Sequence, residues 1–133
     1  MMPNVTLLFA GLHGLLLLAL LVPIVRLRRG RKVGLGDGGD IELLRRIRVH
    51  GNFVETVPFV LLLLALDEMA GAGRWAIVVL GSTLLAARLL HAYGLSRSEG
   101  YSIGRFWGTL LTWTVLLLSS LHGIALAAMN LRY

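Results

Sequence analysis

The sequence predicts an all-α fold in which four helices form a bundle that spans a membrane. Hydrophobic residues make up 56% of the 133-residue chain, and its mean hydropathy is +0.77. Apolar stretches at about residues 5–25, 41–66, 75–95 and 106–131 each approach or exceed the roughly 20 residues that a helix needs to cross a hydrocarbon core. Because a chain of this length accommodates one domain, we expect residues 1–133 to form a single transmembrane domain.

The first span carries no charge, and the N-terminus before it lacks the basic region and cleavage site of a signal peptide. We therefore expect it to be retained in the membrane. A glycine-rich connector follows, and Asp40 is placed to cap the second span. Pro23 and Pro58 lie within the first two spans, where membrane helices tolerate a kink.

The third span is interrupted only by Arg88 and His91, and the fourth begins just after Arg105. His13 and His122 lie deep in the first and fourth spans without a charged neighbour in the sequence, so we assign both to helix packing.

Basic residues predict the topology. Eight of them lie between Arg26 and Arg48, and Arg97 and Arg105 flank the third loop. The positive-inside rule then places these two loops in the cytoplasm and both termini on the other side. We interpret Arg28, Arg29, Arg31, Lys32 and Arg46 as topogenic charges at the headgroups.

A stripe of polar residues runs along the start of the second span. In a helix, Arg45, Arg48, Asn52 and Glu55 are spaced i, i+3, i+7 and i+10, which places them on one face. An ionisable group at bilayer depth is costly and normally serves a purpose, and Glu55 is too deep to be explained by topology. Glu55 could pair with Arg88 on the third span, bind a ligand, or do both.

The composition excludes several kinds of chemistry. The chain has no cysteine, so it has neither a disulfide framework nor a thiol nucleophile of its own. No two histidines have the i, i+4 spacing of a helical metal site, and we expect no metal. The net charge is +6, and the basic residues lie beside apolar spans. This arrangement favours membrane lipids and an anionic small ligand as binding partners over nucleic acid.

These motifs resemble the MAPEG family, the membrane-associated proteins in eicosanoid and glutathione metabolism. The second span carries Arg45, Arg48, His50, Asn52, Glu55, Thr56 and Pro58 in the order of the family's motif. Arg88 and His91 in the third span, then Arg105 at the head of the fourth, are similar to its second region, and Arg26-Leu27-Arg28 resembles its first loop.

The resemblance implies a homotrimer of four-helix bundles that binds glutathione between subunits, open to the cytoplasm. It assigns glutathione binding to Arg26, Arg48, His50, Asn52, Glu55, Arg88 and His91, and stabilisation of the glutathione thiolate to the catalytic Arg105. Glutathione has two carboxylates, which arginine side chains can bind through paired hydrogen bonds. It also has one amine, which a single glutamate can bind. Leu95 occupies the position where members of the family commonly have a tyrosine. Tyr93 and Tyr101 are therefore the candidates for the role of that tyrosine.

Departures at Gly51 and Phe106, where some members have arginine and serine, argue against a specific prostaglandin or leukotriene synthase. We expect a glutathione transferase or peroxidase in a bacterial inner membrane, acting on a lipophilic electrophile or a lipid hydroperoxide. One alternative is a non-catalytic relative that binds lipid or a partner protein. A small multidrug exporter is the other alternative, but its first span should carry a glutamate, and residues 5–25 have none.

Overall fold

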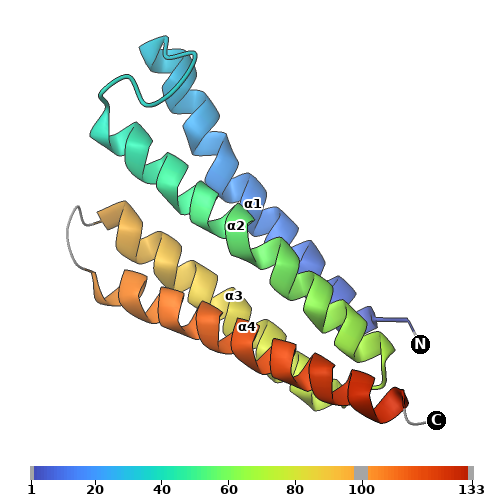
Figure 1. The fold of residues 1–133 in the computed structure, drawn as a ribbon. Helices are drawn as coiled ribbons and strands as arrows, with labels where there is room; N and C mark the ends of the chain where they lie inside the picture. Colours follow the sequence, from blue (N-terminus) through green and yellow to red (C-terminus); the bar gives the residue numbers. More distant parts are fainter. Residues whose placement is uncertain (1, 98–101, 132–133) are drawn as a thin grey trace.

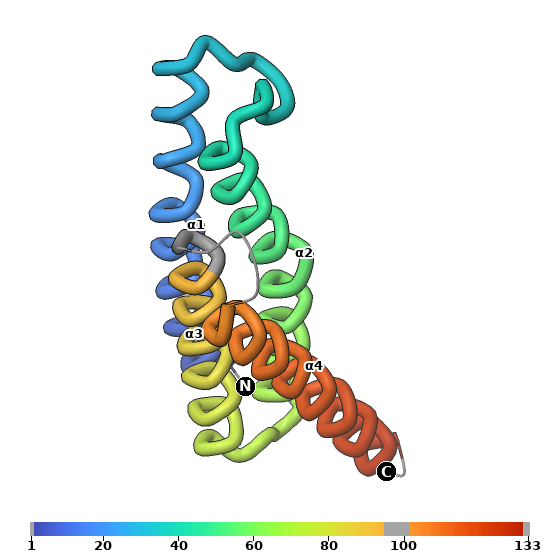
Figure 2. Tube along the Cα trace, turned by 90° about the vertical axis from the view of Figure 1, so that its left-hand side faces the viewer, coloured from blue at the N-terminus to red at the C-terminus, as the bar shows by residue number. Residues whose placement is uncertain are grey.

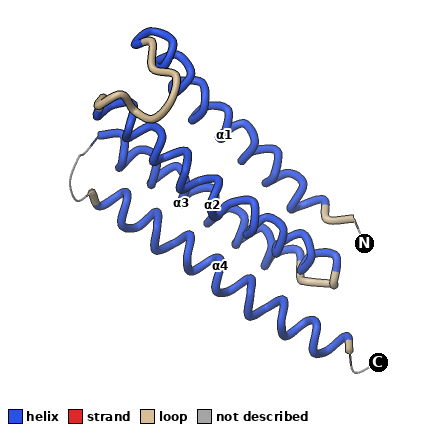
Figure 3. Tube along the Cα trace, turned by 45° about the horizontal axis from the view of Figure 1, so that its top comes forward, coloured by secondary structure: helices blue, strands red, loops and turns tan. Residues whose placement is uncertain are grey.

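The computed structural model describes residues 2–97 and 102–131 and forms a bundle of four antiparallel helices (Figure 1). They are α1 (Asn4–Arg31), α2 (Ile41–Met69), α3 (Arg74–Arg97) and α4 (Ile103–Asn130). All four are long and apolar enough to cross a membrane. The described part of the chain contains helices and connecting loops and no strand (Figure 3). The predicted all-α four-helix bundle is therefore confirmed.

Helices α2 and α3 form the centre of the bundle, because each of them contacts the three other helices while α1 and α4 are not in contact. The α2 side chains Phe53, Val57, Val60 and Leu64 recur every three to four residues and are almost fully buried. They pack against residues of α3 and α4, namely Ile77, Leu84 and Val115. This spacing places the core on one face of α2, as expected for a period of about 3.6 residues.

The ends of α1 and α2 that meet at the connector are defined by a left-handed residue and a side-chain cap. Asp40 caps α2 by accepting a hydrogen bond of 2.9 Å from the backbone N–H of Leu43, as the sequence predicts. Helix α1 ends at Lys32, which adopts a left-handed conformation with φ of 54°. Arg31 then pairs with Asp40 and Glu42 across the connector, which joins the ends of α1 and α2.

The beginning of α1 is capped from another helix. The carboxylate of Glu68, near the end of α2, accepts hydrogen bonds from the backbone N–H groups of Val5 (2.9 Å) and Thr6 (2.8 Å). It also accepts one of 2.7 Å from the Thr6 hydroxyl. A carboxylate at a helix N-terminus satisfies unpaired donors and complements the helix dipole. Glu68 therefore fixes α1 against α2 at the end of the bundle where both chain termini lie (Figure 1).

Glycines allow α3 and α4 to approach closely where α4 begins, and the two helices diverge towards the end of α4 (Figure 2). A Cβ atom added to Gly104 would lie 2.9 Å from the carbonyl oxygen of Leu90. One added to Gly108 would lie 2.6 Å from the carbonyl oxygen of Ala87 and 2.7 Å from Cβ of His91. Only glycine fits such contacts, as at small-residue helix interfaces in membranes. This close packing sets the position of His91 relative to the start of α4.

Candidate functional site

The polar stripe of α2, apart from Arg45, forms one wall of a pocket of about 340 Å³. Arg48, Gly51, Asn52 and Glu55 line it from α2, and His91 and Arg105 close it from α3 and α4. These residues come from three helices and lie up to 57 positions apart in the sequence (105 − 48). The fold thus gathers in one place the side chains that the sequence singled out as the core of the candidate site.

Arg88 lies behind this pocket and does not line it. Its side chain is 1% exposed and lies over the ring of Phe53, with 5.7 Å between the guanidinium carbon and the ring centroid. One terminal nitrogen donates a hydrogen bond of 2.8 Å to Oδ1 of Asn52, and the other lies 3.4 Å from Nδ1 of His91. Arg88 therefore holds two of the residues that line the pocket.

These contacts determine which groups Asn52 and His91 can offer to a ligand. Because Oδ1 of Asn52 accepts from Arg88, the amide nitrogen of Asn52 is available as a donor. A guanidinium has no acceptor, so Nδ1 of His91 must be the acceptor in its contact with Arg88. The ring proton of a neutral His91 then resides on Nε2, which becomes a second donor. The pocket is thereby lined with donors and cations that suit an anionic ligand.

The ion pair between Glu55 and Arg88, one of the alternatives that the sequence leaves open, is not formed. Arg88 bonds to Asn52, which precedes Glu55 by almost one helical turn. Glu55 is exposed and makes no ion pair with any residue in the ranges that the structure describes. Its carboxylate stays open to the pocket, where it is the single acidic side chain of the lining.

Arg105 lies in the first turn of α4, and its side chain is exposed. Ser102 caps this helix by accepting a hydrogen bond of 3.5 Å from the backbone N–H of Arg105. The side chain thus adds a full positive charge to the partial positive charge of a helix N-terminus. Both charges favour an anion at this end of the pocket.

Other predicted site residues do not line this pocket. Arg26 and Tyr93 are exposed on α1 and α3, and His50 is half-buried on α2. Tyr101 lies outside the residues that the structure describes. Gly51, noted in the sequence only as a departure, lines the pocket, and a Cβ atom there would meet no other atom within 4 Å. The signal that could have identified it is its spacing of three residues from Arg48 and four from Glu55.

The two histidines assigned to packing differ from each other. His13 is buried, its Nδ1 lies 2.7 Å from the carbonyl oxygen of Phe9, and its ring packs against Phe53, which confirms the assignment. His122, which has no charged neighbour in the sequence, has one in the structure. Its Nδ1 lies 3.2 Å from Oδ2 of Asp67 on α2.

Comparisons with known proteins agree with the fold and the motifs. Residues 6–125 match the MAPEG family. The chain is also 42% identical over 120 residues to the inner membrane protein YecN of Escherichia coli strain K12, with 90% of each chain covered. The same identity and coverage hold for the inner membrane protein YecN of Escherichia coli O6:H1 strain CFT073.

Proposed function

Because the chain belongs to the MAPEG family, which includes glutathione transferases, we propose that it binds glutathione and activates its thiol. The acceptor would be a lipophilic electrophile dissolved in the bilayer. The observation that carries the proposal is the composition of the α2–α3–α4 pocket. Arg48 and Arg105 supply positive charge, Asn52 and His91 supply donors, and Glu55 supplies the single negative charge.

Glutathione matches this arrangement group by group. Its two carboxylates require cations and hydrogen-bond donors, which Arg48, Asn52 and His91 offer. Its ammonium requires one carboxylate, and Glu55 has no competing ion pair within the described chain. Arg88 is a positioning residue that acts through Asn52 and His91.

The chemistry follows from Arg105. A cation near a thiol typically lowers its pKa by about 1–3 units, and each unit corresponds to about 1.4 kcal/mol in favour of the thiolate. The thiolate attacks the electrophilic carbon, the carbon–sulfur bond forms, and a leaving group such as chloride departs with its electron pair. With a lipid hydroperoxide, two glutathione molecules are instead oxidised to the disulfide while the peroxide is reduced to an alcohol and water.

We place the pocket on the cytoplasmic side of a bacterial inner membrane, with both termini on the opposite side. The concentration of basic residues around the α1–α2 connector supports this orientation, and the location named for YecN supports the membrane. We expect the lipophilic substrate to reach the pocket from the bilayer along α1 and α4, which are not in contact within one chain. We also propose the homotrimer that the family resemblance implies.

A titration of the detergent-purified protein with glutathione tests the binding step. A chlorinated aromatic electrophile in the same sample then tests the transfer step. We expect saturable binding and a thioether product that requires Arg105. Binding without turnover of electrophiles or hydroperoxides would favour the non-catalytic alternative, and absence of glutathione binding would overturn the proposal. Light scattering corrected for detergent tests the trimer, which a monomeric mass under ligand-binding conditions would contradict.

A further inference from the structure

Two neighbouring carboxylates near the end of α2 have different environments. Asp67 and Glu68 are 2% and 7% exposed. Both oxygens of Glu68 are occupied by the start of α1, which explains why this side chain is buried. Asp67 has only one partner among the described side chains, His122. Capping of a helix therefore does not explain why the Asp67 carboxylate is buried.

The second oxygen of Asp67 is open. Oδ2 lies 3.2 Å from Nδ1 of His122, while Oδ1 accepts no hydrogen bond from any residue that the structure describes. A Cβ atom added to Gly123 of α4 would lie 2.7 Å from this Oδ1. The absence of a side chain at Gly123 therefore leaves room for the carboxylate between α2 and α4. A buried carboxylate with one incomplete partner is costly, which points to a further partner.

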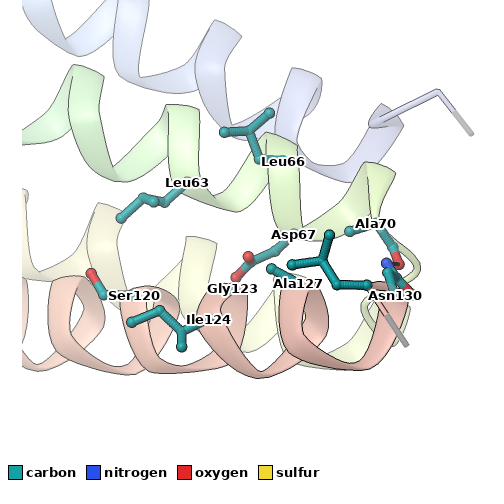
Figure 4. A pocket seen from close by; sticks show the side chains of 10 residues that line it. Leu63, Leu66, Asp67, Ala70, Ser120, Gly123, Ile124, Ala127 and Asn130 are labelled. Carbon is teal, nitrogen blue, oxygen red and sulfur yellow. Dashed lines mark hydrogen bonds between the residues drawn. The ribbon is translucent and has the colours of Figure 1, made fainter. Parts of the chain in front are cut away.

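Asp67 lines a second cavity, an open groove of about 760 Å³ between α2 and α4 whose walls include the exposed side chains of Leu66 and Ile124 (Figure 4). The other walls are mainly apolar and include Leu63, Leu66, Ile124 and Ala127. The carboxylate projects from α2 towards Gly123 in this space (Figure 4). Asp67 follows Asn52 of the first pocket by 15 positions, or about 22 Å along a helix at about 1.5 Å per residue. The two sites are therefore separate.

We propose that this cavity binds a lipophilic amine, with its apolar body against α2 and α4 and its protonated nitrogen on Oδ1 of Asp67. The volume is in the range of pockets for small molecules, which are typically about 300–1,000 Å³. A pure hydrocarbon would leave the carboxylate unsatisfied, and a fatty acid would place a second negative charge beside it. The proposal does not depend on glutathione binding at the other pocket.

Dodecylamine is the probe that tests it, with dodecanoic acid as the probe of equal chain length and opposite charge. Calorimetry on the detergent-purified full chain should show saturable binding of the amine. Binding should weaken at least tenfold in Asp67→Asn, and dodecanoic acid should bind the wild type at least tenfold more weakly than the amine. Glu42→Gln removes an exposed carboxylate at the other end of α2 and should leave the affinity for the amine unchanged. Equal binding of the two probes, or unchanged amine binding in Asp67→Asn, would overturn the proposal.

Two further variants keep the test valid if Asp67→Asn folds poorly. Ala127→Phe should fill the cavity and abolish amine binding while the melting temperature is retained; unchanged amine affinity in this variant would overturn the proposal. Because the chain has no cysteine, Ile124→Cys introduces a single thiol into the cavity wall. Dodecylamine should protect this thiol from a membrane-permeant maleimide. Cross-linking of Ile124→Cys between two copies, without protection by the amine, would show that a second copy covers the cavity and would contradict the proposal.

Discussion

Replacing Arg88 with methionine should separate the stability of the bundle from its affinity for glutathione. The substitution removes the 2.8 Å bond to Asn52, and a hydrogen bond to a charged group contributes about 1.5–3 kcal/mol. It also removes a cation that is 1% exposed and has no carboxylate partner among the described residues. Replacing buried ionic groups with apolar side chains is often neutral or stabilising by about 1–4 kcal/mol. These two effects nearly cancel, so we expect a melting temperature that is unchanged or higher.

The loss should appear in the pocket. Without Arg88, the amide of Asn52 and the ring of His91 can rotate, and the donors they present are no longer fixed. Loss of one oriented hydrogen bond to a ligand carboxylate corresponds to at least about 1.4 kcal/mol, or tenfold in affinity.

Calorimetry with glutathione and thermal unfolding of the same sample provide the two readouts. Arg46→Met removes a half-buried arginine that pairs with Glu42 outside the pocket, and it should change neither quantity. A large fall in the melting temperature of Arg88→Met with unchanged glutathione affinity would refute the positioning role and make Arg88 a structural residue.

Three further variants test other parts of the account. Glu55→Gln should weaken glutathione binding at least tenfold in calorimetry, because the ligand ammonium loses the single carboxylate of the pocket lining and a hydrogen bond to a charged group contributes about 1.5–3 kcal/mol; Glu42→Gln is the control, and unchanged affinity would exclude the ammonium contact. Gly108→Ala places a Cβ atom 2.6 Å from the backbone of α3 and should lower the melting temperature, since overpacking costs about 1–3 kcal/mol. At Gly14 an added Cβ meets nothing within 4 Å of the same chain, so Gly14→Ala is the matched variant; equal melting temperatures would contradict the close contact. Glu68→Gln should destabilise the bundle by about 1–3 kcal/mol through the cap of α1 while glutathione affinity is retained, and an unchanged melting temperature would show that the cap is dispensable.

The sequence predicted well those features that depend on one helix. The spacing of Arg48, Asn52 and Glu55 determines that they share a face, because helix geometry is local. Asp40 was likewise identified as a cap from its position alone, and Asp40 indeed accepts from Leu43.

Contacts between helices could not be predicted from the spacing of residues along a single helix. The partner of Arg88 depends on how α3 is placed along α2, and a difference of less than one turn exchanges Glu55 for Asn52. The bond between Asp67 and His122 joins residues 55 positions apart. In the sequence, Asp67 directly follows the expected second span of residues 41–66, and nothing near His122 indicates that α4 passes beside it.

The most direct test of the central claim is the ultraviolet absorbance of the thiolate in the complex of the purified protein with glutathione near neutral pH. We expect a thiolate signal in the wild type that disappears in Arg105→Ala, with turnover reduced far more than affinity. Arg105→Lys keeps the charge without the planar fork and should retain part of the signal. Bound glutathione that remains a thiol in the wild type, or an Arg105→Ala variant with wild-type turnover and an unshifted thiol titration, would contradict the account.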